Sequence, residues 1–332
     1  MTRRSALVFG GLTALFLALA AARLCIGSSG AGWSANAGIM ADRGGSLLAA
    51  SLVGGALALS GLMLQALLCN PLADPYVLGL ASGAGLGVSL RRWLGITGLF
   101  GGASLWAIGG ALLASAVVFA FGRRARGGKG ALEGAGVDPL AMVLSGVVVG
   151  VFCAAASMLV GQLMGPGVRD EISRWMLGAI QPVAFECSWG ALGAPLVLAL
   201  SLASGLAWLL WRGPQVDAAT LPEAEARSLG LPLARLRILL FAWSAMLAGA
   251  AVVVAGPVAF AGLIAPHAAR LLAGPRHRVL APAAVLCGMS LVVAGDLAGS
   301  AFHLVTGGGV LPVGIFTAML GGPAFLFMLR KR

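Results

Sequence analysis

The sequence predicts an all-α polytopic membrane protein with about ten transmembrane helices. Of the 332 residues, 59% are hydrophobic and only 10% are charged. A soluble domain carries about 25% charged residues, so this chain has too few polar side chains to cover a water-exposed surface. Apolar stretches that reach the roughly 20 residues needed to cross a bilayer recur along the whole length. Because an open sheet edge cannot lie in lipid, we expect the spans to be helices.

Ten apolar stretches are the predicted spans, and together they form one transmembrane domain over residues 1–332. They cover residues 5–26, 46–68, 76–90, 98–121, 139–164, 189–211, 236–255, 258–272, 279–299 and 311–329. The third and the eighth are short and rich in glycine. The first is expected to be a retained helix because many spans follow it; the alternative, a cleaved signal peptide, is suggested by Arg3-Arg4 before an apolar run.

The basic residues predict how the chain is oriented. With the N-terminus placed in the cytoplasm, 16 of the 22 lysines and arginines fall in inside segments and 6 in outside segments. This agrees with the positive-inside rule. Ten spans also return the basic C-terminus to the cytoplasm. The net charge of +11 is therefore interpreted as topological, and no nucleic-acid partner is expected.

The stretch LLCNPLADPYVLGLASGAGLG, residues 67–87, separates the second predicted span from the third. Pro71 and Pro75 cannot continue a helix interior, whereas Asn70 and Asp74 favour turns and caps. A tight cytoplasmic turn is therefore predicted. The small residues after it allow another backbone to approach closely. The turn is either a simple helical hairpin or a constriction at the inner mouth of a pathway.

Residues 212–235, RGPQVDAATLPEAEARSLGLPLAR, form the longest polar segment on the predicted cytoplasmic side. Within it, Glu223, Glu225 and Arg227 lie in a short amphipathic stretch that ends near Gly230, a residue typical of helix C-termini. Pro232 follows, as expected after a helix stop. A helix this short has little stability alone. The segment is interpreted as a docking surface for a cytoplasmic partner, with an ordinary charged connector as the alternative.

No catalytic site, metal site or cofactor is predicted in the chain. The five cysteines are scattered without a C-x-x-C pair and are interpreted as small buried hydrophobes. No G-x-x-x-x-G-K-[ST] motif occurs, so the chain lacks a phosphate cradle of that kind. The three histidines are far apart in sequence, and His277, which lies between two arginines, is expected to be solvated.

Asp296 lies inside the ninth predicted span. A carboxylate in lipid is costly and indicates a specific role. It could cap or bridge a helix break near Gly295 and Gly299, or it could relay ions in an ion-driven secondary transporter. The structural role is favoured because no second intramembrane carboxylate accompanies it, as a relay would need.

Several long motifs resemble the permeases of iron-chelate, haem and vitamin B12 ABC importers, the FecCD or type II importer family. The resemblance covers roughly residues 43–330. The motifs are SGLMLQALLCNPLADPYVLGLASGAGLG, VLSGVVVG, ISRWMLGAI, EARSLGLPL, VAGPVAFAGLIAPHAARLLAGPRHRVLAP, AGDLAG and LPVGIFTAMLGGPAFLFMLRKR. They occur in the family's order along the chain.

The resemblance implies a type II importer permease fold and a subunit that is not itself an enzyme. The permease would sit in a bacterial inner membrane, in contact with lipid, and would dimerise with a second permease subunit. Two cytoplasmic ATPase subunits would bind ATP, and a periplasmic binding protein would deliver a siderophore, haem or cobalamin. Transport would follow an alternating-access mechanism.

The resemblance also implies roles for particular residues. The family's turn is matched by Pro71, Asp74 and Pro75, and its cytoplasmic gate by Asn70 and Leu72. Its ATPase-coupling segment is matched by Glu223, Glu225, Arg227, Ser228 and Gly230, with Pro222 where a glycine is common.

The family's docking motif for the binding protein, R-x-P-R, is only partly matched. Arg43 provides the first arginine, but Ser46 stands at the place of the second, and Ser300 stands at the place of a further family arginine. Docking through three charge pairs is therefore not expected.

Overall fold

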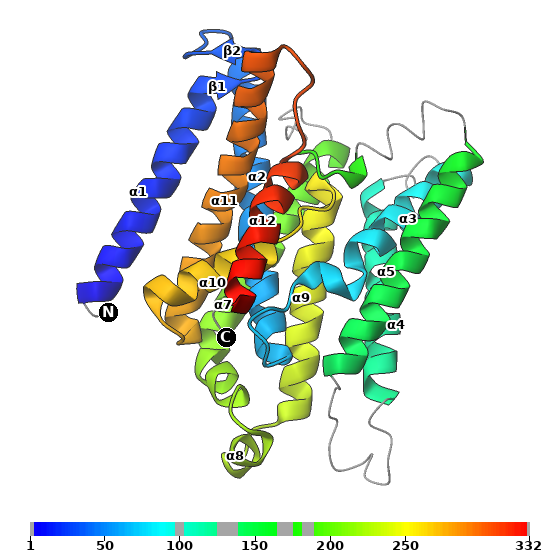
Figure 1. Ribbon diagram of the computed structural model, residues 1–332, viewed down its shortest axis with the longest axis vertical. Coiled ribbons are helices and arrows are strands. Elements are labelled where there is room, and N and C mark those ends of the chain that lie inside the picture. Colours follow the sequence, from blue (N-terminus) through cyan, green and yellow to red (C-terminus); the bar gives the residue numbers. More distant parts are fainter. Residues whose placement is uncertain (1–2, 97–102, 125–138, 165–174, 181–188, 331–332) are drawn as a thin grey trace.

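The computed structural model describes residues 3–96, 103–124, 139–164, 175–180 and 189–330, and most of its long helices run along one axis (Figure 1). The helices are α1 Arg3–Cys25, α2 Ala37–Leu67, the 3-10 helix η1 Pro75–Leu78, α3 Leu80–Trp93, α4 Ala103–Arg124, α5 Pro139–Gln162, α7 Trp189–Ala219, α8 Glu223–Ser228, α9 Leu233–Ala255, α10 Ala261–Ala273, α11 His277–Thr306 and α12 Val313–Arg330. Strands β1 Ile26–Gly27 and β2 Gly30–Ala31 pair as a short antiparallel hairpin.

The all-α membrane fold predicted from the sequence is confirmed. Within the described ranges, seven helices are long and apolar enough to cross a membrane, namely those in α1, α2, α4, α5, α7, α9 and α11. The other three predicted spans coincide with shorter helices. These are α3 after η1, the 13-residue α10 and the 18-residue α12.

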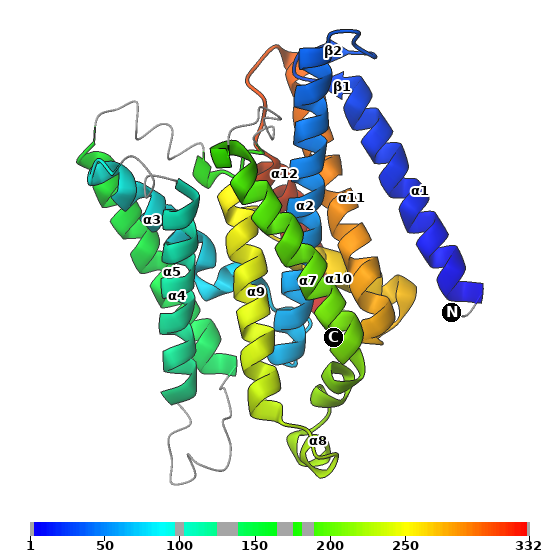
Figure 2. The same ribbon diagram turned by 180° about the vertical axis from the view of Figure 1, so that it is seen from behind.

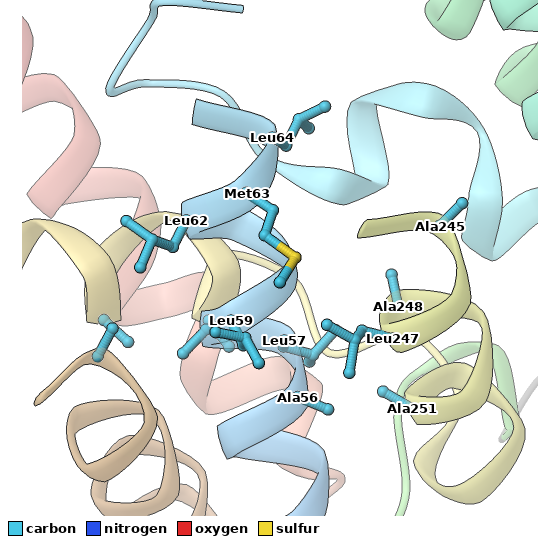
Figure 3. Packing of buried hydrophobic residues seen from close by; sticks show 14 of the residues in the cluster. Ala56, Leu57, Leu59, Leu62, Met63, Leu64, Ala245, Leu247, Ala248 and Ala251 are labelled. Atoms are coloured by element: carbon cyan, nitrogen blue, oxygen red, sulfur yellow. The ribbon is translucent and has the colours of Figure 1, made fainter. Parts of the chain in front are cut away.

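Helix α2 forms the centre of the larger group of helices, which also contains α7, α9, α10 and α11. Its second half is apolar on all sides, and Leu57, Leu59 and Met63 are fully buried. Figure 3 shows these side chains beside Leu247 and Ala248 of α9. A helix that is hydrophobic all round belongs in a packed interior. A buried hydrogen bond also joins α2 to α9: the Ser60 hydroxyl donates to the carbonyl oxygen of Ser244 at 2.7 Å.

Glycines allow α2 to cross its neighbours at very short distances. A Cβ on Gly61 would lie 1.8 Å from the carbonyl oxygen of Gly262 in α10. A Cβ on Gly54 would lie 2.2 Å from the carbonyl oxygen of Gly288 in α11. In lipid there is no hydrophobic force between helices, so the close van der Waals packing that small residues allow holds them together. These two contacts therefore fix where α10 and α11 lie on α2.

Helices α3, α4 and α5 form a second group on the far side of α9 (Figure 1). The small-residue run after the turn packs closely on α4, as predicted: a Cβ on Gly83 would lie 2.6 Å from the carbonyl oxygen of Gly110. Gly79 precedes α3 with φ +70 and lies against Gly150 of α5. The rings of Phe119 and Phe241, with centroids 4.7 Å apart, connect α4 to α9.

The two ends of the bundle differ. The β1–β2 hairpin lies at one end, here called the hairpin end, and α8 protrudes at the other, here called the α8 end (Figures 1 and 2). Helix α1 runs towards the hairpin and α12 runs away from it. The first residue of α1 and the last residue of α12 therefore both point towards the α8 end, which agrees with an even number of crossings.

Candidate functional site

The predicted turn after α2 is present and is held by its own backbone. Helix α2 ends at Leu67, and Cys69 takes a left-handed conformation with φ 47. The Asn70 amide donates to the Gln65 carbonyl at 3.0 Å, and the Asn70 side-chain oxygen accepts from the Leu72 amide at 3.0 Å. Residues Asn70–Pro75 are here called the gate turn. Asparagine forms such turns readily because its side chain can replace a backbone acceptor.

The second half of the gate turn is fixed by Asp74. Its Oδ1 accepts from the Tyr76 amide at 2.8 Å and so caps η1, in which Pro75 is the first residue. Pro75 lies against Gly262 of α10, where an added Cβ would meet its Cδ at 2.7 Å. The Tyr76 hydroxyl accepts from the amide of Val258 at 3.0 Å. The turn is therefore bound to the segment that precedes α10.

Asp74 lies outside the membrane-spanning helices but is buried. Burial raises the pKa of its carboxyl from 3.8 to about 6, while the backbone amides of Tyr76 and Phe260 lower it by less. Among the described residues, its Oδ2 has no hydrogen-bond partner of good geometry. The turn thus contains an acid that ionises near neutral pH.

The two predicted gate residues lie on the surface of this chain. Asn70 is exposed and Leu72 is half-buried, and neither is enclosed by the described residues. Both side chains are therefore accessible to a partner subunit or a pathway. Their role as a gate stays a prediction.

The predicted coupling segment differs in part from the structure. Helix α7 continues past Arg212 and Pro214 to Ala219, so the first third of residues 212–235 is helical. The short helix α8, Glu223–Ser228, follows as predicted, and Gly230 after it is left-handed with φ +71. Pro222 precedes the helix without a side-chain cap.

Helix α8 has one buried anchor and an exposed face. Ala226 is fully buried, whereas Glu225, Arg227, Ser228 and Gly230 are exposed. Helix α8 lies outside the bundle, beside the end of α7 (Figure 2). Such a surface is available for docking, although the coupling roles of these residues, including Glu223, stay predictions.

The expectation that His277 is solvated is wrong. His277 is 4% exposed, and its Nδ1 lies 2.6 Å from Oδ1 of Asp217 at the end of α7. The same oxygen accepts from the His277 backbone amide at 3.0 Å and so caps the start of α11. The pair therefore links the end of α7 to the start of α11.

Arg43 lies inside the hairpin end and not on its surface. It is 4% exposed, and its guanidinium donates to the carbonyl oxygens of Leu24, Cys25, Gly32 and Gly30 at 2.7 to 3.1 Å. In this arrangement its side chain is not available to an acidic group of a partner. Docking through Arg43 stays a prediction, but the geometry restricts it to an indirect role, in which Arg43 holds the hairpin that a partner would contact.

Asp296 forms an ion pair. Its Oδ2 lies 2.5 Å from Nε of Arg23 in the last turn of α1, and the side chains are 12% and 6% exposed. Arg23 also donates to the carbonyl oxygen of Ile26 at 3.0 Å. The structure therefore favours a structural role for Asp296, which holds α1 against α11. Asp296 pairs with Arg23, whereas the sequence predicted that it would cap or bridge a helix break near Gly295 and Gly299.

A family comparison covers nearly the whole chain: the model of the FecCD transport family matches residues 8–331. The chain belongs to the FecCD transport family. It is accordingly an ABC transporter permease, a membrane transport subunit and not an enzyme.

Curated FecCD relatives include the vitamin B12 import system permease protein BtuC. The proteins of Salmonella paratyphi A and of Klebsiella pneumoniae are each 34% identical to this chain over 285 residues, or 86% of the chain and 81% and 80% of the relatives. That of Shigella sonnei is 35% identical over 285 residues, or 86% of the chain and 81% of the relative.

Two solved structures share the fold. One, described as an inward-facing conformation of a metal-chelate type ABC transporter, has a TM-score of 0.80 and 26% identity, and the match covers 99% of this chain and 100% of that one. PsaBC from Streptococcus pneumoniae has a TM-score of 0.55 and 15% identity, over 86% of this chain and 90% of that one. The second likeness concerns the fold alone.

Sequence reasoning missed the partners of two charged residues in this FecCD protein. Arg23 and Asp296 are 273 positions apart, and Asp217 and His277 are 60 apart. A usable signal existed for the first pair: a buried acid needs a cation, and Arg23 ends the first span on the side where the ninth also ends. For His277 there was no comparable signal, because its sequence neighbours are two exposed arginines.

Proposed function

We propose that this chain is the permease subunit of an ATP-driven importer for an iron chelate, haem or cobalamin. The cargo would come from a periplasmic binding protein and pass inward by alternating access between two permease subunits. The relatives named as vitamin B12 permeases and the metal-chelate type neighbour support this class of cargo. A path lined by small and apolar residues would suit a large chelate without binding it tightly.

The observation that carries the proposal is the arrangement at the α8 end. Helix α8 presents its exposed face there, and the gate turn lies at the same end (Figure 2). Asp217, near the end of α7, is bonded to His277, and the carbonyl oxygen of Ala219 lies 4.0 Å from Sγ of Cys69, next to the gate turn. A displacement of α8 would therefore reach the gate turn through α7.

The partners follow from the same class. A second permease subunit and two ATPase subunits are expected for an ABC importer permease, with ATP bound on the ATPases. The α8 end would face the cytoplasm, where the ATPases dock, and the hairpin end would face the periplasmic binding protein. The positive-inside count supports this orientation, because 16 of the 22 basic residues fall in segments predicted from the sequence to be cytoplasmic.

An ion-driven transporter built on Asp296 is the alternative, and the Arg23 contact weighs against it. A relay carboxylate must gain and lose its proton during the cycle, whereas Asp296 is held by a guanidinium at 2.5 Å. An arginine keeps its charge at all relevant pH values and so favours an ionised partner. The importer proposal needs no titration of Asp296.

Transport by the assembled complex tests the proposal. The complex would be purified with its ATPase from native membranes, placed in liposomes, and assayed with radiolabelled cobalamin, ferric siderophore and haem in separate experiments. We expect ATP-dependent accumulation of one of the three. Accumulation that needs an ion gradient and not ATP would support the secondary transporter instead.

A further inference from the structure

A polar cavity of about 210 Å³ lies at the α8 end, beside the gate turn. Its wall includes Gln65 from α2, Asn70 from the gate turn, Thr220 after α7, Arg270 from α10 and His277 from α11. The cavity between α3, α4 and α5 is lined almost entirely by apolar residues and glycine, as a lipid-facing groove would be. The polar cavity is different in kind, because it collects groups that donate hydrogen bonds.

Arg270 brings a positive charge to this cavity. Within the described part of the chain its only hydrogen bond goes from Nη2 to Oε1 of Gln65, at 3.3 Å, and no carboxylate pairs with it. A guanidinium carries five N–H donors, so most of its capacity is unused. It lies in the last turn of α10, where the helix dipole stabilises a cation.

His277 brings a buried ring nitrogen without a partner. Its Nδ1 faces Asp217, and because that carboxylate accepts only, Nδ1 carries a proton. Nε2 is buried and has no hydrogen-bond partner among the described residues. His277 is among the residues that line the cavity, but because its Nε2 is buried, the imidazole forms part of the wall and is not counted among the donors.

The Asn70 side chain suits an anion better than a cation. Its oxygen is already used by the Leu72 amide, which leaves the amide nitrogen as a donor. The Thr220 hydroxyl donates to the Asp217 carbonyl at 2.7 Å, so it provides no further donor. No carboxylate is among the residues that line the cavity. Asp217 does not line the cavity but contacts the lining residue His277.

We propose that this cavity binds a phosphate-type oxyanion, held by the guanidinium of Arg270 and the side-chain amide of Asn70 beside the gate turn. Guanidinium groups form strong, paired hydrogen bonds with phosphate oxygens. Basic pockets between helices at the membrane surface bind the headgroups of acidic lipids. The phosphate therefore comes either from a phospholipid headgroup of the leaflet at the α8 end or from solution. The site itself does not depend on the proposed transport function.

A bound phosphate would connect two elements. Arg270 ends α10 and Asn70 belongs to the gate turn, so an anion in contact with both would restrain the turn. Loss of the anion would remove this restraint. Occupancy would therefore stabilise the folded chain, which gives a readout that needs no cargo and no ATPase.

The first test uses the delipidated full-length protein in a neutral detergent. Thermal unfolding is followed in inorganic phosphate and in sodium chloride of equal ionic strength. We expect phosphate to raise Tm of the wild type, and to raise it much less in Arg270→Gln. Arg235→Gln, which removes an exposed arginine from the first turn of α9, is the matched control and should respond as the wild type does.

The second test separates the two sources. Phospholipids that remain bound after mild purification are counted by mass spectrometry. If the source is a headgroup, we expect at least fivefold more phosphatidylglycerol on the wild type than on Arg270→Gln, and displacement by added phosphate. A phosphate-dependent Tm rise without retained lipid assigns the site to soluble phosphate.

Two results would overturn the proposal. One is a wild-type Tm that is the same in phosphate and chloride together with equal lipid retention in Arg270→Gln. The other is an equal effect of Arg235→Gln, which would indicate general surface charge. If Arg270→Gln does not fold, Arg270→Lys takes its place, because it keeps the charge and removes the paired geometry. The comparison of phosphate with chloride on the wild type needs no variant and still decides whether the anion binds.

Discussion

Nε of Arg23 lies 2.5 Å from Oδ2 of Asp296, and this contact joins the end of α1 to α11. Most of the described surface of α1 is not buried by the rest of the chain. The ion pair is therefore a specific attachment in a helix with few other constraints. Both side chains are largely withdrawn from solvent, so each depends on the other for compensation of its charge.

Removing one member of this pair should cost more than removing both. We expect Asp296→Asn or Arg23→Gln to lower the free energy of unfolding by about 3–5 kcal/mol, because an uncompensated buried charge remains. The double variant Arg23→Leu with Asp296→Leu should lose less than either single variant. Denaturant unfolding in detergent measures all three. Equal and additive losses would show that the two residues do not interact.

The crossing of α2 and α10 should not tolerate a side chain at Gly61. A Cβ there would lie 1.8 Å from the Gly262 carbonyl oxygen, so the helices must separate. We expect Gly61→Ala to destabilise the fold by about 1–3 kcal/mol or more. Gly44→Ala is the control in the same helix, since nothing lies within 4 Å of its Cβ position. It should be neutral or stabilise by about 0.5–1 kcal/mol.

Asp74 should make stability depend on pH. Its carboxyl has a pKa of about 6 in the folded chain, against 3.8 when unperturbed. Below 3.8 the group is neutral in both states. As pH rises from about 4 towards 6, the unfolded chain ionises first. The folded chain still holds the proton, so the free energy of unfolding falls as pH passes through this window. The loss amounts to about 3 kcal/mol above pH 6.

Asp74→Asn removes that titration and keeps the oxygen that accepts from the Tyr76 amide. Between about pH 4 and about pH 7, we expect the variant to gain stability relative to the wild type. Asp42→Asn, at an exposed position of α2, should leave the wild-type pH dependence unchanged. Thermal unfolding over this pH range provides the measurement. Parallel curves for the wild type and Asp74→Asn would contradict the assignment.

Arg43 should act through the hairpin and not through direct charge pairing. Its guanidinium donates hydrogen bonds to carbonyl oxygens before β1, within β2 and directly after β2. Arg43→Gln should therefore lower the free energy of unfolding by at least about 2 kcal/mol, since several charge-assisted hydrogen bonds are lost. It should also speed amide exchange in residues 24–32. Unchanged exchange and stability, with loss of binding-protein affinity alone, would restore a direct docking role.

Much of the fold could be predicted from local patterns. Apolar length identified the long helices, and Asn70, Pro71, Asp74 and Pro75 identified the turn, because each of these residue types has a backbone preference of its own. Gly230 marked the end of α8 for the same reason. These features depend on few residues that are close in sequence, so they can be derived without the tertiary structure.

Tertiary contacts account for what the sequence did not reveal. Helix α7 extends through Pro214 to Ala219 because its end is held by the Asp217–His277 contact. Arg43 resembled a surface residue, but the chain folds back over it at the hairpin. The turn chemistry of the candidate site could be predicted, whereas its electrostatics could not, since the partners come from distant helices.

The exposed face of α8 should determine binding of the ATPase. Reversing the charge of Glu225 should reduce the amount of ATPase that co-purifies by about tenfold, the change that 1.4 kcal/mol of lost affinity produces. Asp42→Lys, a charge reversal at an exposed position of α2 near the hairpin end, is the control. Because only Ala226 of the described α8 side chains is buried, both variants should fold and insert normally.

Purification of the tagged wild-type chain from its native membrane, with identification of what remains bound, tests the central claim most directly. The account predicts a cytoplasmic ATPase in equal numbers with the permease and a bound corrinoid, haem or iron chelate in the presence of cargo. Purification under mild conditions with no ATPase, together with uptake that follows an ion gradient, would contradict it.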